Sequence, residues 1–188
     1  MAKRVFIVHG WMAGPRSNWF PWLKDQLEAI GVQVFVPGMP NSAVPSPDAW
    51  LEKLSETVGQ PDEECYFVGH SFGCITVLRY LEMLTEKKVG GLILVAGFAE
   101  IAFNPELSPL HSFFDKPIRW DWIKSRIIKK PVVIMSDNDY MVTPAQGEIL
   151  QKNLDAKLMI EHNKGHFTGL DGIKVLPSAL EALSNLMK

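Results

Sequence analysis

Short apolar runs alternate along the chain with longer amphipathic stretches. The first run, residues 4–8, is continuously apolar from Val5 to Val8 and contains β-branched residues, which is typical of a strand buried on both faces. Comparable runs recur through the rest of the chain. Together they predict six β-strands, at residues 4–8, 32–36, 65–68, 91–96, 132–135 and 158–160.

The stretches between these runs repeat their apolar residues at helical spacing. Residues 47–58 place Leu54 and Val58 on one face, whereas residues 74–84 are apolar nearly all round, which is typical of a helix buried against a sheet. Ser17 is suited to cap the first helix. Helices are therefore expected at residues 17–30, 47–58, 74–84, 120–128, 144–154 and 177–187.

Strands that alternate with helices predict an α/β fold. We expect a compact three-layer sandwich of about six mostly parallel strands with helices on both faces, formed by a single domain over residues 1–188. Right-handed crossovers bring the carboxyl ends of such strands to one edge of the sheet, where ligands bind. The segments that directly follow strands are therefore the candidates for chemistry.

Two segments fit neither pattern. Residues 37–47 contain four prolines and predict a surface loop. Residues 97–119 show no clean period, and a connection of that length is usually either functional or disordered. Its aromatic content argues against disorder. These aromatic residues are Phe98, Phe103, Phe113 and Phe114.

The sequence Gly69-His70-Ser71-Phe72-Gly73 stands between a predicted strand and a predicted helix. Gly-x-Ser-x-Gly in that setting is typical of a nucleophile elbow, a sharp turn that lifts the serine hydroxyl above the end of the sheet. Glycine is expected at both flanking positions because a Cβ there would collide with the neighbouring strand or helix. Ser71 is therefore the candidate nucleophile.

A serine hydroxyl needs a base within hydrogen-bond reach, and the base in turn needs an orienting acid. In the α/β-hydrolase chain order of Ser, then acid, then His, these are Asp139 after the fifth strand and His166 after the sixth. Asp137 is the alternative acid, although it would otherwise brace its loop. His162 is the alternative base.

Backbone N–H groups are expected to bind the oxyanion that forms on the substrate. The α/β-hydrolase arrangement points to the N–H of Phe72 and to the N–H of Trp11 in the loop after the first strand, with Met12 as the neighbouring option. Trp11, Met12, Phe98 and Phe113 are the candidates to line an apolar substrate site, although each ring could equally belong to the core. His9 and His70 are expected to be packing groups near the site.

Composition narrows the remaining function classes. A net charge of −2 leaves no electrostatic footprint for nucleic acid or an acidic membrane surface. Cys65 and Cys74 suggest neither a disulfide framework nor a metal site, and the proposed chemistry needs no cofactor. The longest apolar run, residues 92–99, is far shorter than a membrane span, and no signal peptide is evident. Cytoplasmic residence is the default expectation.

These motifs resemble the small α/β-hydrolases of the YdeN and retinoblastoma-binding protein 9 family. The resemblance rests on His9-Gly10-Trp11, the segment Ser17 to Leu23, the elbow at Ser71, the Asp139 loop and Gly165-His166-Phe167. The first loop is similar to that of the bacterial branch. The resemblance implies a compact α/β-hydrolase fold without a large cap domain, and a serine hydrolase triad at Ser71, Asp139 and His166.

The function expected from these residues is hydrolysis of a small-molecule carboxylic ester with a small or medium acyl group, through an acyl-enzyme intermediate. An amidase or aminopeptidase-like serine hydrolase would use the same side chains. The alternative from another class is a non-enzymatic protein-interaction module, because a fold does not by itself determine a function. The sequence identifies no protein partner.

Overall fold

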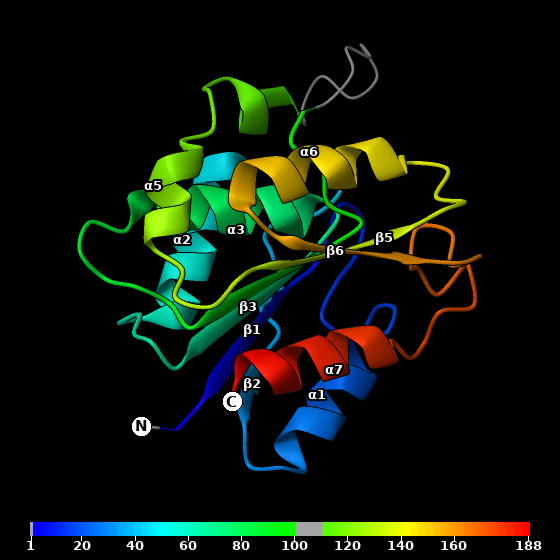
Figure 1. Cartoon of the computed structure of the whole chain (residues 1–188), viewed down its shortest axis with the longest axis horizontal. Coiled ribbons are helices and arrows are strands. Elements are labelled where there is room, and N and C mark those ends of the chain that lie inside the picture. Colours follow the sequence, from blue (N-terminus) through cyan, green and yellow to red (C-terminus); the bar gives the residue numbers. More distant parts are fainter. Residues whose placement is uncertain (1, 101–110) are drawn as a thin grey trace.

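The computed structural model describes residues 2–100 and 111–188, and it contains a six-stranded sheet covered by helices on both faces (Figure 1). The strand order is β2-β1-β3-β4-β5-β6, and every pairing between neighbours is parallel. The strands are β1 (Arg4–Val8), β2 (Gln33–Phe35), β3 (Cys65–His70), β4 (Gly91–Val95), β5 (Val132–Ser136) and β6 (Lys157–Glu161). This confirms the predicted α/β-hydrolase architecture.

Two groups of helices cover the sheet (Figure 1). Helices α1 (Phe20–Glu28) and α7 (Pro177–Leu186) lie on one face. On the other face lie α2 (Pro47–Val58), α3 (Phe72–Met83), α5 (Trp120–Ser125) and α6 (Pro144–Leu154). A short 3-10 helix, η2 (Ser112–Phe114), precedes α5. None of the helices among these described residues combines the length and the apolar character needed to cross a membrane.

Each face of the sheet has its own hydrophobic core. Trp50 and Phe67 belong to the core beneath α2, α3, α5 and α6, whereas Trp19 and Phe20 belong to the core beneath α1 and α7. Helix α3 is buried along most of its length, as its uniformly apolar sequence predicts. Every residue of the inner strands except Arg4 is buried, so their carboxyl ends are held within the core at one edge.

Two predicted helix boundaries are wrong for local reasons. The first helix begins at Phe20 and not at Ser17, because Asn18 has a φ of 54° and interrupts helical backbone. The Ser17 hydroxyl instead accepts a hydrogen bond from the Gly14 N–H. The helix predicted over 120–128 ends at Ser125, since the chain then leaves it to form a parallel bridge between Ile127 and Val89.

Candidate active site

The turn at Ser71 joins β3 directly to α3. Ser71 has φ 54° and ψ −122°, a backbone conformation that non-glycine residues rarely adopt and that costs about 1–3 kcal/mol. A Cβ on Gly73 would lie 2.0 Å from the Val8 carbonyl oxygen, and a Cβ on Gly69 would lie 2.7 Å from the Cys74 Cα. Both flanking positions therefore require glycine, and the segment has the geometry expected of a nucleophile elbow.

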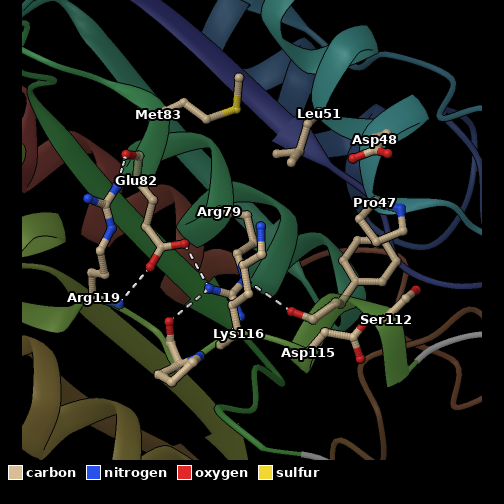
Figure 2. A pocket seen from close by; sticks show the side chains of 12 residues that line it. Pro47, Asp48, Leu51, Arg79, Glu82, Met83, Ser112, Asp115, Lys116 and Arg119 are labelled. Carbon is tan, nitrogen blue, oxygen red and sulfur yellow. Dashed lines mark hydrogen bonds and ion pairs between the residues drawn. The ribbon is translucent and has the colours of Figure 1, made fainter.

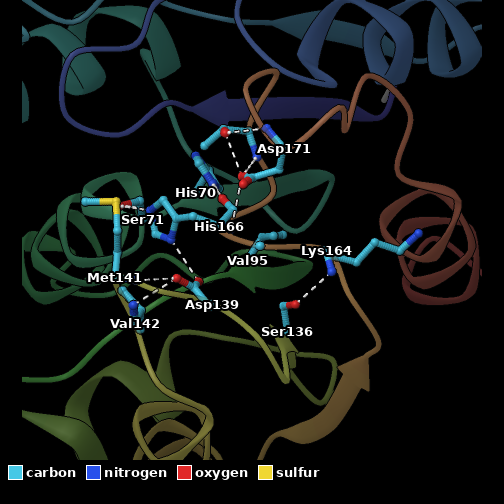
Figure 3. A network of polar contacts seen from close by, with 12 residues as sticks. His70, Ser71, Val95, Ser136, Asp139, Met141, Val142, Lys164, His166 and Asp171 are labelled. Atoms are coloured by element: carbon cyan, nitrogen blue, oxygen red, sulfur yellow. Dashed lines mark hydrogen bonds and ion pairs between the residues drawn. The ribbon is translucent and has the colours of Figure 1, made fainter.

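Three side chains that are distant in the sequence meet above this turn (Figure 3). His166 Nε2 lies 3.0 Å from Ser71 Oγ, and His166 Nδ1 lies 2.8 Å from Asp139 Oδ2. A carboxylate only accepts hydrogen bonds, so Nδ1 carries the proton and Nε2 presents its lone pair to the serine hydroxyl. All three residues are buried, with exposed fractions of 5%, 8% and 4% for Ser71, Asp139 and His166.

The Asp139 carboxylate is oriented by its own loop. Its Oδ1 accepts hydrogen bonds from the N–H groups of Met141 and Val142, at 2.8 and 2.9 Å (Figure 3). This leaves Oδ2 free to face the imidazole of His166. The sequence Asp139-Tyr140-Met141-Val142 suits this arrangement, because a side chain that bonds its own downstream backbone needs that short separation.

The alternative acid and the alternative base pair with each other, away from Ser71. Asp137 Oδ2 lies 2.6 Å from His162 Nδ1, and Asp137 Oδ1 accepts the N–H of Asn163. Both hydrogen bonds lower the pKa of the Asp137 carboxyl, and the bond from the Asn163 N–H has the larger effect. Both side chains are exposed. The structure thus brings Asp139 and His166 to Ser71, and it gives Asp137 and His162 a bracing position in the neighbouring loop.

Side chains that the sequence analysis did not single out hold the His166 loop in place. Asp171 Oδ2 accepts hydrogen bonds from the N–H groups of His166 and Thr168, each at 3.0 Å, and from the Thr168 hydroxyl. Asn138 Oδ1 accepts the N–H of Gly165 at 2.8 Å. A threonine followed three residues later by aspartate in a glycine-containing loop is a recognisable signal of such a side-chain-stabilised turn.

The loop after β1 lies directly against the serine. A Cβ on Gly10 would be 2.8 Å from Ser71 Cβ and 3.3 Å from its Oγ, so only glycine allows this approach. His9 orients the loop: its Nε2 accepts the Met39 N–H at 3.0 Å, which makes Nδ1 the protonated nitrogen that donates to the Gly10 carbonyl. Burial lowers the pKa of His9, in keeping with a neutral ring.

The backbone N–H groups of Trp11 and Phe72, which are expected to bind an oxyanion, differ from that of Met12 in having no internal hydrogen-bond acceptor in the described structure. The Met12 N–H donates to the Ser42 carbonyl and the Trp11 indole donates to that of Ala43, so the loop at 37–47 supports this segment. Within the part of the chain that the structure describes, the Trp11 N–H makes no hydrogen bond. Phe72 is the first residue of α3, where a backbone N–H has no partner inside the helix.

The residues expected to line the substrate site are not alike in exposure. Met12 is 69% exposed, whereas Phe98 and Phe113 are 6% and 1% exposed and pack edge-on against the ring of Phe72. Trp11 is half-buried. Phe103, in the same aromatic segment, lies outside the described residues. A substrate contact from Phe98 or Phe113 stays a prediction.

A separate pocket of about 690 Å³ is lined by residues of α2, of α3 and of the segment 112–119, Phe113 among them (Figure 2). Its polar lining includes the ion pair between Arg79 and Glu82, which are 2.8 Å apart. Arg79 also donates to the carbonyl oxygens of Phe113, Lys116 and Pro117. Ser71 and His166 do not line this pocket, so it is distinct from the serine site.

The described ranges, residues 2–100 and 111–188, contain no group of three or more histidine, cysteine, aspartate or glutamate side chains placed to hold a metal ion. Cys65 and Cys74 are both buried and free. Burial raises the pKa of the Cys65 thiol to about 11, and burial also raises that of Cys74. Neither thiol is therefore prepared to act as a nucleophile or a ligand.

Comparison with known proteins agrees with this geometry. A family model described as serine hydrolase matches residues 5–185. The chain is 37% identical to YdeN from Bacillus subtilis (strain 168) over 98% of this chain and 96% of YdeN. It is 31% identical to the serine hydrolase RBBP9 from Rattus norvegicus, over 80% of this chain and 78% of that protein.

The crystal structure of the ydeN gene product from B. subtilis superposes with a TM-score of 0.92, at 36% identity and with 98% of each chain covered. These findings confirm the resemblance drawn from the motifs. The family model spans nearly the whole chain, and a relative above 30% identity covers it almost completely. The chain therefore belongs to the serine hydrolase family, on an α/β-hydrolase fold.

Proposed function

We propose that the protein hydrolyses carboxylic esters of small or medium acyl groups, with Ser71 as nucleophile, His166 as general base and acid, and Asp139 as the group that orients His166. The observation that carries this proposal is the continuous contact from Asp139 Oδ2 through the imidazole to Ser71 Oγ, at 2.8 and 3.0 Å. A binding module would need neither of these two contacts, and membership in the serine hydrolase family supports the same chemistry.

In the first half of the reaction, Ser71 Oγ forms a bond to the ester carbonyl carbon as His166 Nε2 takes the hydroxyl proton. The carbonyl electron pair moves onto oxygen, and the N–H groups of Trp11 and Phe72 bind the resulting oxyanion. When the tetrahedral intermediate collapses, the bond to the alcohol oxygen breaks. His166 gives its proton to that oxygen, and the acyl group stays on Ser71.

In the second half, water attacks the acyl-enzyme while His166 Nε2 accepts a proton from it. Collapse of the second intermediate breaks the bond to Ser71 Oγ, which recovers the proton, and the carboxylic acid leaves. No metal or organic cofactor enters either half. Trp11 and the exposed Met12 directly follow Gly10, which lies against Ser71, and this supports an apolar acyl group as the part of the substrate that they contact.

Hydrolysis of p-nitrophenyl butyrate tests the proposal. We expect Ser71→Ala to lower kcat/KM by roughly 10⁴–10⁶-fold, as loss of the nucleophile does in serine proteases. A fluorophosphonate probe should label the wild-type protein at Ser71 and should not label this variant. Unchanged turnover in Ser71→Ala would refute the assignment.

Two variants in one loop, Asp139→Asn and Asp137→Asn, test which aspartate orients His166. Asp139→Asn should lower kcat by about 10⁴-fold, because an amide favours the wrong tautomer of His166. Asp137→Asn removes a carboxylate two residues away that pairs with His162, and its kcat should stay within about threefold of wild type, as for a surface change remote from the reacting atoms. The reverse ranking would exchange the two roles.

Two further readouts separate the alternatives. A panel of p-nitrophenyl esters beside aminoacyl anilides measures whether ester or amide hydrolysis dominates. A folded wild-type protein that neither turns over any of these substrates nor reacts with the probe would favour the protein-interaction module.

A further inference from the structure

His70 lies next to the proposed nucleophile but reaches toward the proposed base. It is the last residue of β3 and is 2% exposed. Its Nε2 lies 2.9 Å from the backbone carbonyl oxygen of His166 (Figure 3). A carbonyl oxygen only accepts, so His70 Nε2 carries a proton and donates it to this bond. His70 Nδ1 is then an unprotonated nitrogen, and it has no partner among the described residues.

Aromatic rings pack against His70. The rings of Trp19 and Phe20 meet it edge-on, with centroids 6.0 and 5.8 Å away. On its other side the ring of His166 lies 5.2 Å away. Trp19 and Phe20 belong to the core beneath α1 and α7, so His70 connects that core to the backbone of His166.

The backbone of His166 needs such support. Its neighbours Gly165 and Phe167 have φ values of 54° and 55°, both in the left-handed region, and this conformation is costly for phenylalanine. Side chains hold the peptide groups of His166 at both ends: Asp171 accepts its N–H at 3.0 Å, and His70 donates to its carbonyl at 2.9 Å. These two bonds hold the backbone from which the imidazole reaches Ser71 and Asp139.

The donor to this carbonyl is also uncharged. Burial lowers the pKa of His70 to about 3, so its ring is neutral near neutral pH. During the proposed reaction His166 becomes a cation, and a second positive charge about 5 Å away would oppose that step. Lysine or arginine at this position could donate to the carbonyl but would carry that charge. Histidine with a protonated Nε2 is a buried donor without it.

We propose that His70 is a positioning residue for the proposed base: its bond to the His166 carbonyl keeps the imidazole in line with Ser71. This inference rests on the proposed function. It assigns to a residue inside the elbow a task beyond packing. His70 touches neither the substrate nor the reacting atoms, so it acts only through His166.

His70→Gln and His70→Asn differ in whether the new side chain can donate a hydrogen bond to the His166 carbonyl. The amide nitrogen of glutamine can occupy the place of His70 Nε2 and donate, whereas the shorter asparagine places its amide near Nδ1 and cannot reach the carbonyl. We expect His70→Asn to lower kcat for p-nitrophenyl butyrate by about 10²-fold with KM within about threefold, since small misplacement of a catalytic group has that effect. His70→Gln should keep kcat within about fivefold of wild type. Labelling of Ser71 by the fluorophosphonate probe should follow the same order.

Phe20→Leu is the control for packing alone. Phe20 packs edge-on against the His70 ring and is fully buried, but it makes no hydrogen bond to His166. This variant should melt at a lower temperature and still retain its kcat. If His70→Asn does not fold, His70→Leu replaces it, because leucine keeps the apolar contacts with Trp19 and Phe20 and lacks the donor.

Equal kcat in the asparagine or leucine variant and the glutamine variant would overturn this inference. So would a loss of kcat in Phe20→Leu as large as that in His70→Asn, since packing alone would then explain it. Either result in the presence of an active wild type leaves the proposed function intact. A wild-type protein without hydrolysis and without labelling would overturn both.

Discussion

Acid should destabilise this protein through His70 in particular. The unfolded chain carries His70 with its ordinary pKa of 6.5, whereas burial in the folded protein lowers that pKa to about 3. Between these two values the unfolded state binds a proton that the folded state does not. The free energy of unfolding therefore falls as the pH is lowered from about 6.5 toward 3, and the stabilisation is fully present only above that range.

The size of this effect follows from the two pKa values. From pH 7 to pH 4.5, the proton taken up by the unfolded chain at His70 should lower the free energy of unfolding by about 2.5 kcal/mol. Carboxylates and His9 titrate over the same range and contribute their own changes. A variant that cannot titrate at position 70 separates these contributions from that of His70.

The assay is urea denaturation, followed by tryptophan fluorescence, of the wild-type protein and His70→Gln at pH 7 and at pH 4.5. Trp19, one of six tryptophans, packs on His70 in the folded state, so it contributes to a fluorescence signal that follows unfolding of the whole domain. The wild type should lose about 2.5 kcal/mol more than the variant between the two pH values, because every other titrating group is common to both. A difference below about 0.5 kcal/mol would mean that folded His70 accepts a proton at an ordinary pKa, and the reasoning would fail.

Two further changes test the framework around the site. Gly73→Ala should destabilise the fold by about 3 kcal/mol or more in thermal or urea denaturation, since its Cβ would lie 2.0 Å from the Val8 carbonyl oxygen; a stability equal to wild type would contradict the close approach. Arg79→Met should cost about 2–3 kcal/mol and speed amide exchange over residues 112–119, because Glu82 loses its part-buried ion-pair partner and three carbonyl oxygens of that segment lose their donor. Arg126→Met removes an arginine stacked on an indole at the surface and should cost less than about 1 kcal/mol, which makes it the matched control.

The elbow shows how far a local pattern can predict structure. Gly69, Ser71 and Gly73 stand between an apolar run and a helical run, and the steric demands of that turn are set by residues adjacent in the chain. The strand positions and the parallel sheet could be predicted for a similar reason, because the period of apolar residues reflects which faces of each element are buried. Helix ends were harder to place: the left-handed Asn18 that delays α1 has no sequence signal as strong as a glycine.

The loop at 37–47 could be recognised as a loop but not as a support. Its Met39 N–H bonds to His9, and its Ser42 carbonyl accepts the Met12 N–H. In each contact the loop contributes a backbone group, which carries no information about its partner in the sequence. They nevertheless decide that the Trp11 N–H, and not that of Met12, is left without an internal partner in the described structure.

By itself, the sequence determined the α/β class, the elbow at Ser71 and the order of candidate residues along the chain, since each depends on spacing within one or two neighbouring elements. Only the tertiary structure decided that Asp139 rather than Asp137 faces His166, and that His70 and Asp171 hold the backbone of His166. Two aspartates in one loop differ in the direction of their side chains. That direction is set by packing among segments that meet only when the chain has folded.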